Sequence, residues 1–127
     1  MNKILLSGAV LGLLSVLMAA YMDHSLSAIL TTKELHSMTT AIRYHQLYAI
    51  VITIIGLIIP LQANQRMRSW LVASACIFMM GVLLFSFSIY LALSTGVSEL
   101  LRFVPVGGLM LMIGWGALMC VALLKNA

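Results

Sequence analysis

The chain has 127 residues, of which 63% are hydrophobic and 8% are charged, and its formal net charge is +4 at pH 7. Soluble domains carry about 25% charged residues, so this composition cannot give a folded domain a water-facing surface. The composition therefore predicts an integral membrane protein, and the length is that of a single domain. The positive charge does not indicate nucleic-acid binding, because no basic cluster is interleaved with aromatic residues.

Four apolar stretches are long enough to cross the bilayer core, which requires about 20 residues per helix. They cover roughly residues 4–22, 44–61, 69–94 and 105–124. The links between them are too short to hold a soluble domain. We therefore predict an all-α integral membrane fold, an antiparallel four-helix transmembrane bundle that forms one domain over residues 1–127.

The first stretch carries small residues on a single helix face. Gly8, Gly12, Ser15 and Ala19 recur at helical spacing, and Asp23 continues the same face. Small residues allow helix backbones to approach closely in lipid, so this face predicts helix packing. The pattern favours packing within the monomer and leaves contact with a second copy as the alternative. A signal peptide is a further alternative, but the run is long enough to span, and we expect a retained helix.

The second helix is predicted to begin before its apolar run. Thr31-Thr32-Lys33-Glu34 has the Thr-x-x-Glu pattern of a capping box with Thr31 at the cap. We expect a helix from about residue 32 to Ile59, stopped by Pro60, which cannot donate a backbone hydrogen bond. The first turns of this helix would then extend beyond the hydrocarbon at the outer end of the bundle.

The third stretch has a small or polar residue at every seventh position. Ser74, Gly81, Ser88 and Thr95 form a second stripe suited to helix packing. Gly96 follows directly and is expected to end the helix, because glycine readily adopts the left-handed conformation of a C-cap.

The fourth stretch is predicted to begin at Pro105, since proline fits the first turn of a helix. Gly107, Gly108 and Gly114 make this span rich in small residues, which again predicts close helix packing. Trp115 lies too deep for the aromatic belt at the membrane boundary. We therefore expect it to pack against a neighbouring helix.

The charged residues divide unevenly between the two ends of the predicted bundle. All three acids, Asp23, Glu34 and Glu99, fall at one end. The other end carries most of the cations, namely Lys3, Arg66, Arg68 and Lys125. Basic residues favour the cytoplasmic side of a membrane, so we expect both termini in the cytoplasm.

A polar cluster is predicted where the second helix enters the hydrocarbon. On this helix the cluster comprises Arg43, Tyr44, His45, Gln46 and Tyr48. These side chains point in all directions, because successive helical residues are about 100° apart. Other outer helix ends contribute Asp23, His24, Ser86, Ser88 and Tyr90. Unpaired charge at membrane depth is costly, so Arg43 is expected to pair with an acid, and Asp23 is the first choice.

Two interpretations of this cluster stay open. It is either an outward-opening pocket for a small polar ligand, a lipid headgroup or protons, or a hydrogen-bonded plug that fixes the helix ends. We expect no metal, because His24, His45 and Asp23 lack the spacing of paired ligands on one helix, and we expect no cofactor. The chain also lacks the G-x-S-x-G, Walker A and H-E-x-x-H motifs, so we expect no enzyme activity.

Several short motifs resemble a known family. Thr40-Ala41-Ile42-Arg43-Tyr44 is similar to its Thr-Ala-x-Arg-Tyr, and the segment 85–90 is similar to its Phe-Ser-Gly-Ser-x-Tyr. The segment 105–108 with Gly114-Trp115 resembles its Pro-x-Gly-Gly and Gly-Trp, and the segment 20–26 resembles the end of its first span. The family is the YgdD/YwdK type of small bacterial inner-membrane proteins, grouped as domain of unknown function 423. The resemblance implies four spans in the bacterial inner (plasma) membrane and no particular activity.

These observations favour a non-catalytic helix bundle in the lipid bilayer that associates with other membrane proteins or lipids through its small-residue faces. The partner could be another membrane protein or a second copy in a homo-oligomer. One alternative is a small carrier or channel with an outward-facing polar vestibule around Arg43. A second alternative is a membrane enzyme that uses His24 or His45. Spans three and four contain no charged residue, which disfavours a proton-coupled pump.

Overall fold

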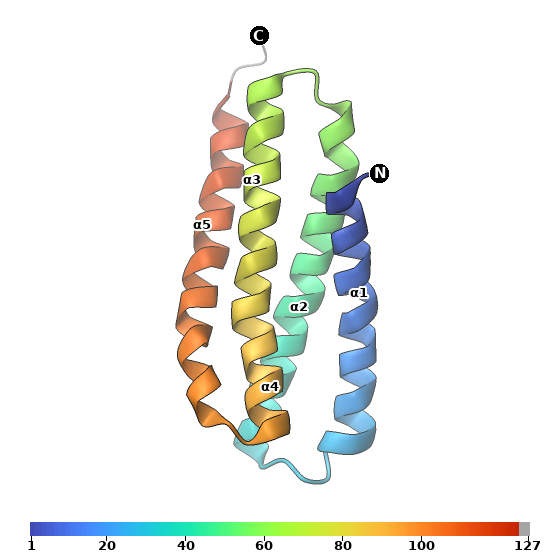
Figure 1. The fold of residues 1–127 in the computed structure, drawn as a ribbon, viewed down its shortest axis with the longest axis vertical. Coiled ribbons are helices and arrows are strands. Elements are labelled where there is room, and N and C mark those ends of the chain that lie inside the picture. Colours follow the sequence, from blue (N-terminus) through green and yellow to red (C-terminus); the bar gives the residue numbers. More distant parts are fainter. Residues whose placement is uncertain (125–127) are drawn as a thin grey trace.

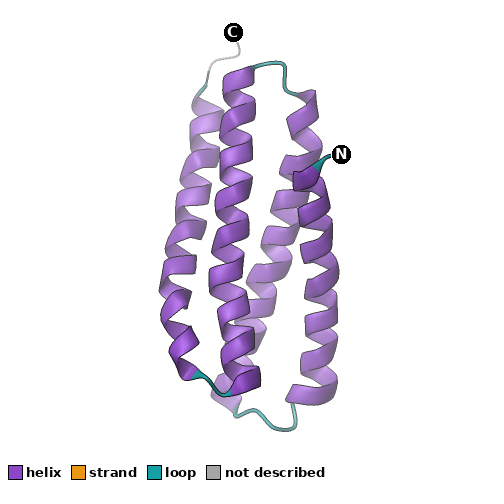
Figure 2. Ribbon diagram, viewed as in Figure 1, coloured by secondary structure: helices purple, strands orange, loops and turns teal. Residues whose placement is uncertain are grey.

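The computed structural model describes residues 1–124, and Lys125, one of the cations expected at the cytoplasmic end, lies outside them. Four long helical rods run antiparallel to one another, and strands are absent from the described residues (Figures 1 and 2). Each rod is long and apolar enough to cross a membrane. The predicted all-α four-helix architecture is therefore confirmed.

The four rods contain several helical segments. The first is α1 (Lys3–Tyr21) followed by a π-helical turn at Met22–Leu26, and the second is α2 (Thr32–Ile58), which ends in a 3-10 turn at Ile59–Leu61. The third joins α3 (Gln65–Val82) to α4 (Ser88–Thr95) through a π-helical segment at Leu83–Phe87. The fourth is α5 (Val104–Leu123), preceded by a 3-10 turn at Ser98–Phe103.

The start of α2 has the capping box that the sequence predicts. The Thr31 hydroxyl accepts from the Glu34 backbone N–H at 3.3 Å, and the Glu34 carboxylate accepts from the Thr31 N–H at 2.8 Å. These bonds satisfy backbone donors that a helix start otherwise leaves open. The helix ends at Ile58, one residue before the predicted position, and Pro60 lies in the 3-10 turn that follows.

The link between the last two rods also follows from local sequence. Gly96 ends α4 with a left-handed φ of 75°, and its N–H donates to the Ala92 carbonyl at 2.9 Å. Pro105 lies in the first turn of α5. The predicted helix end at Gly96 and the predicted helix start near Pro105 are both confirmed. A glycine C-cap and a proline at a helix start could be predicted because they depend on local backbone geometry.

The four rods are not equally buried. Packing is most extensive between α1 and α2 and between α3 and α5, and Figure 1 shows α5 and α1 on opposite sides of the bundle. In their most apolar windows, 39% of the α2 rod and 44% of the α3–α4 rod are buried, against 17% for α1 and 22% for α5. The second and third rods therefore form the centre, and α1 and α5 present most of their surface to lipid.

Small residues hold α1 close to α2. A Cβ atom added at Gly8 would lie 2.7 Å from the Thr53 backbone nitrogen, and one added at Gly56 would lie 2.6 Å from the backbone nitrogen of Leu5. Such distances leave no room for a side chain. Gly56, which the sequence did not mark as a packing residue, is therefore as important to this interface as Gly8.

The α3–α5 interface is equally close. A Cβ atom at Gly107 would lie 2.8 Å from the carbonyl oxygen of Gly81, and one at Gly114 would lie 2.6 Å from the Phe78 ring. The Ser74 hydroxyl donates to the Gly114 carbonyl at 2.9 Å. Most of the predicted small-residue faces are thus used within the chain, while a Cβ atom at Gly12 would meet nothing within 4 Å and one at Gly108 only the Phe85 ring.

Candidate functional site

The predicted polar cluster separates into two sets with different surroundings. One set is buried in the centre of the bundle and comprises His45, Tyr48, Ser86, Ser88 and Tyr90. The other set is exposed and comprises Asp23, His24, Arg43, Tyr44 and Gln46. The exposed Tyr44 adjoins the buried set, since its ring centroid lies 6.2 Å from that of Tyr48.

The buried set is a hydrogen-bonded plug. His45 is fully buried, its Nδ1 lies 3.1 Å from the Tyr90 hydroxyl, and its ring centroid lies 5.1 Å from that of Phe87. The Ser86 hydroxyl donates to the Ala41 carbonyl of α2 at 2.8 Å. His45 Nε2 is buried without a hydrogen-bond partner among residues 1–124. These contacts tie α2 to the π-helical segment and to α4.

Aromatic rings fill the interior below this plug. The Trp115 indole N–H donates to the Tyr48 hydroxyl at 2.9 Å, which confirms that this tryptophan packs against a neighbouring helix. Phe78 packs against both, with its ring centroid 5.0 Å from that of Tyr48 and 5.4 Å from that of Trp115. Ile52 and Phe78 are completely buried at this level. The interior of the bundle between α2, α3 and α5 is therefore filled by side chains at this level.

The expected ion pair between Arg43 and Asp23 is absent, and the prediction was wrong. Both side chains are exposed, and within residues 1–124 the ion pair that forms is Glu99 with Arg102 at 3.7 Å. The reason is the register of the two helices, which the close contact of Gly8 with Thr53 fixes. That register sets Arg43 about five residues, or about 7 Å, deeper than Asp23 along the helix axis.

His24, His45 and Asp23, the residues considered above as metal ligands, do not come together in the structure. His24 is exposed at the outer end, whereas His45 is enclosed by α2 and α4. In the part of the chain that the structure describes, no group of three or more His, Cys, Asp or Glu side chains could hold a metal ion.

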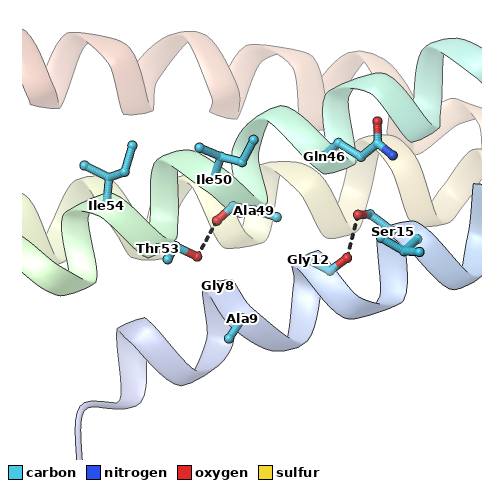
Figure 3. A pocket seen from close by; sticks show the side chains of 10 residues that line it. Gly8, Ala9, Gly12, Ser15, Gln46, Ala49, Ile50, Thr53 and Ile54 are labelled. Carbon is cyan, nitrogen blue, oxygen red and sulfur yellow. Dashed lines mark hydrogen bonds between the residues drawn. The ribbon is translucent and has the colours of Figure 1, made fainter.

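Of the exposed set, Gln46 lines an open groove between α1 and α2 (Figure 3). This α1–α2 groove has a volume of about 440 Å³. Small residues of α1 and mixed residues of α2 line it: Gly8, Ala9, Gly12, Ser15, Val16, Gln46, Ala49, Ile50, Thr53 and Ile54. It therefore combines an open glycine backbone with several polar side chains at membrane depth.

Two of the three polar side chains in the groove are satisfied locally. The Ser15 hydroxyl donates to the Gly12 carbonyl at 2.7 Å, and the Thr53 hydroxyl donates to the Ala49 carbonyl at 2.8 Å (Figure 3). The Gln46 amide is exposed and makes no hydrogen bond to any other described residue. The sequence predicted Gln46 as a member of the Arg43 cluster, but it did not predict that the amide would be exposed in a groove between α1 and α2.

Comparisons with known proteins agree on one family. The family model described as "Protein of unknown function (DUF423)" matches residues 18–108. A "UPF0382 membrane protein" of Haemophilus influenzae is 31% identical over 118 residues, which cover 90% of this chain and 88% of that protein. Another UPF0382 membrane protein, from Staphylococcus haemolyticus, is 28% identical over 116 residues, or 91% of this chain and 90% of that protein.

The search of solved structures gave no significant match. The family match covers most of the chain, and the two relatives align over nearly their whole length. Four membrane-length helices agree with the description of both relatives as membrane proteins. This chain therefore belongs to the DUF423 family of membrane proteins.

Proposed function

We propose that this protein is a non-catalytic helix bundle whose role is to associate with another membrane-spanning protein along the α1–α2 groove. The observation that carries the proposal is the Gln46 amide, which is exposed in this groove and lacks a hydrogen-bond partner among the described residues. The same groove contains Gly12, over which a second helix could approach closely, because a Cβ atom there would meet nothing within 4 Å.

The depth of Gln46 makes its exposure costly. The α1–α2 register sets it level with Ser15, six residues before Tyr21, and therefore about 9 Å below the end of α1. A glutamine side chain is too short to reach the headgroups from there. Polar groups in hydrocarbon are stabilised by hydrogen bonds across helices, so the groove supports a partner that offers such a bond.

A second copy of this chain is the partner that the chemistry favours. A carboxamide carries both a donor and an acceptor, so two Gln46 side chains can bond to each other across a twofold axis. The groove would then form an isologous contact, with Gly12 of each copy at the closest approach. Arg43, about one turn higher on α2, would stay near the headgroups, where a long cationic side chain can reach water.

Fluorescence energy transfer between labelled copies in proteoliposomes tests this proposal. Gln46→Leu is expected to weaken self-association by about three- to thirtyfold, the usual range for one interhelical hydrogen bond in a membrane. Thr53→Val is the matched control, because it also removes a polar group from this groove. The Thr53 hydroxyl already donates a hydrogen bond within α2, so it is not available to a partner. The Thr53→Val protein should associate like the original.

Photo-crosslinking from a residue introduced at Ile50 distinguishes the alternative partners. A product with twice the mass of the chain, lost in Gln46→Leu, supports the second copy. A crosslinked product with a different protein, also lost in Gln46→Leu, would support association through the groove but would show that the partner is not a second copy. Lipid adducts alone, together with unchanged energy transfer in Gln46→Leu, would overturn the proposed function.

We also propose that the protein lies in the bacterial inner membrane with both termini in the cytoplasm. Both relatives named above are bacterial. The described cations at the end of the bundle where α1 begins, Lys3, Arg66 and Arg68, support this orientation, since basic residues favour the cytoplasmic side.

A further inference from the structure

We propose that a cationic cleft at the end of the bundle where α1 begins binds the phosphate group of an anionic phospholipid. The cleft lies between the start of α1, the 3-10 turn after α2 and the first two turns of α3. It has a volume of about 390 Å³, and its lining includes Asn2, Lys3, Ile59, Pro60, Arg68 and Val72. This site is separate from the α1–α2 groove and does not depend on the proposed association.

The cations at this end of the bundle, of which Lys3 and Arg68 line the cleft, have no anionic partner in the described structure. Within residues 1–124, no carboxylate lies within 4 Å of Lys3, Arg66 or Arg68, since the ion pair that forms there is Glu99 with Arg102. The chain's three acids occur at the opposite end, after α1, at the start of α2 and in the 3-10 turn before α5. The field at the cleft is therefore positive and is not neutralised by any carboxylate of residues 1–124.

Helix dipoles add to this field. The N-terminus of a helix carries a partial positive charge and favours acids in its first turn. The first turns of α1 and α3 contain no acid and instead hold Lys3 and Arg66, whereas α2 has Glu34 at the equivalent place. Two helix starts with cations at one end of the bundle would both be stabilised by a bound anion.

The frame of the cleft is fixed by two asparagine caps. The Asn2 side chain accepts from the Leu5 N–H at 3.1 Å and donates to the Gly56 carbonyl at 2.7 Å, which joins the start of α1 to α2. The Asn64 side chain accepts from the Arg66 and Met67 N–H groups at 2.9 and 3.3 Å. Both helix starts are therefore held in place without using the charged side chains.

The floor of the cleft favours a lipid over free phosphate. Ile59 belongs to the buried core, and Ile4 and Val72 pack against it while also lining the cleft. Cations at the rim above an apolar floor match a phosphodiester with its attached acyl chains. Basic sites between transmembrane helices at a membrane surface bind anionic headgroups in this way.

Native mass spectrometry of the full-length protein in neutral detergent tests this site. Phosphatidylglycerol is expected to bind, and Lys3→Gln with Arg68→Gln should weaken its binding roughly 25-fold, since each cation near a membrane surface contributes about fivefold. Lys33→Gln with Arg102→Gln is the matched control, because it removes the same charge from the opposite end. This control should bind phosphatidylglycerol within about twofold of the original protein.

Each contrary outcome overturns the proposal. Equal weakening in both double variants would show a general effect of net charge. Equal binding of phosphatidylcholine, whose choline cation cancels its phosphate charge, would exclude selection for a lipid with net negative charge. Full competition by inorganic phosphate would identify a free anion rather than a lipid. If the double variant does not fold, Arg68→Gln and Arg68→Lys decide, with about fivefold weaker binding expected for the first only.

Discussion

At the scale of single residues, the buried contact between His45 and Tyr90 is the most informative. The imidazole is completely enclosed, and the Tyr90 hydroxyl is its hydrogen-bond partner in the described structure. A buried polar group costs free energy unless it is paired, and this cost is greater where no water can replace the lost bond. The pair therefore stabilises the packing of α2 against α4.

We predict that Tyr90→Phe lowers the free energy of unfolding by about 1–3 kcal/mol, because His45 loses its partner while staying buried. Unfolding in mixed micelles with increasing denaturing detergent measures this change. Tyr44→Phe is the control, since the exposed Tyr44 hydroxyl bonds to no other described residue. Equal stability of the Tyr90→Phe and Tyr44→Phe proteins would contradict the assigned role of the hydrogen bond.

The sequence predicted the members of the polar cluster but not how they divide. His45 and Gln46 are neighbours, yet one enters the core and the other is exposed, because adjacent helical residues point about 100° apart. Which of them turns inward depends on the rotation of α2 against the other rods. That rotation is fixed by distant contacts such as Ser86 with the Ala41 carbonyl, for which no local sequence signal exists.

At the scale of helices, glycines set the distance between neighbouring rods. Gly107 has room for no side chain because backbone atoms of Phe85, Leu84 and Gly81 surround the position where a Cβ would lie. Backbone atoms cannot rotate away as a flexible side chain can. Gly116 lies on the same helix, and a Cβ atom there would meet nothing within 4 Å.

We predict that Gly107→Ala destabilises the bundle by about 1–3 kcal/mol through overpacking. Gly116→Ala should change stability by less than about 0.5 kcal/mol, because its surroundings are open. Thermal unfolding of the two variants in the same detergent measures the difference. A Gly107→Ala protein as stable as Gly116→Ala would show that α3 and α5 are not held at the described distance.

Helix ends were more predictable than helix contacts. The capping box at Thr31, the C-cap at Gly96 and the start near Pro105 all follow from residues within a few positions of each other. Gly56 was missed because an isolated glycine in an apolar run has the same sequence signal whether it faces a helix or lipid. Its role becomes clear only from its contact with Leu5.

At the scale of the whole molecule, charge separates along the long axis of the bundle. The chain start and the end of α5 lie at the same end, as expected for an even number of rods (Figure 1). All three acids belong to the opposite end. The composition was sufficient to predict the membrane fold, whereas the unequal burial of the four rods was not predicted, because the four apolar stretches are similar in hydropathy.

The proposed orientation predicts which links react with an impermeant thiol reagent. In a Cys76→Ser and Cys120→Ser background, Ser98→Cys should react in intact spheroplasts, since the turn before α5 would lie outside the cytoplasm. Gln62→Cys, in the link between α2 and α3, should react only after lysis. The reverse pattern of labelling would contradict the proposed topology.

The central position of the second and third rods has a consequence for chain connectivity. The closest backbone contacts lie within the hairpin formed by α1 and α2 and within the hairpin formed by α3, α4 and α5. The exposed link around Ala63 joins these two hairpins and contributes nothing to either glycine interface. Two co-expressed fragments divided at Ala63 should therefore insert separately and reassemble, and their co-purification through a tag on one fragment would measure how far each hairpin is a folding unit of its own.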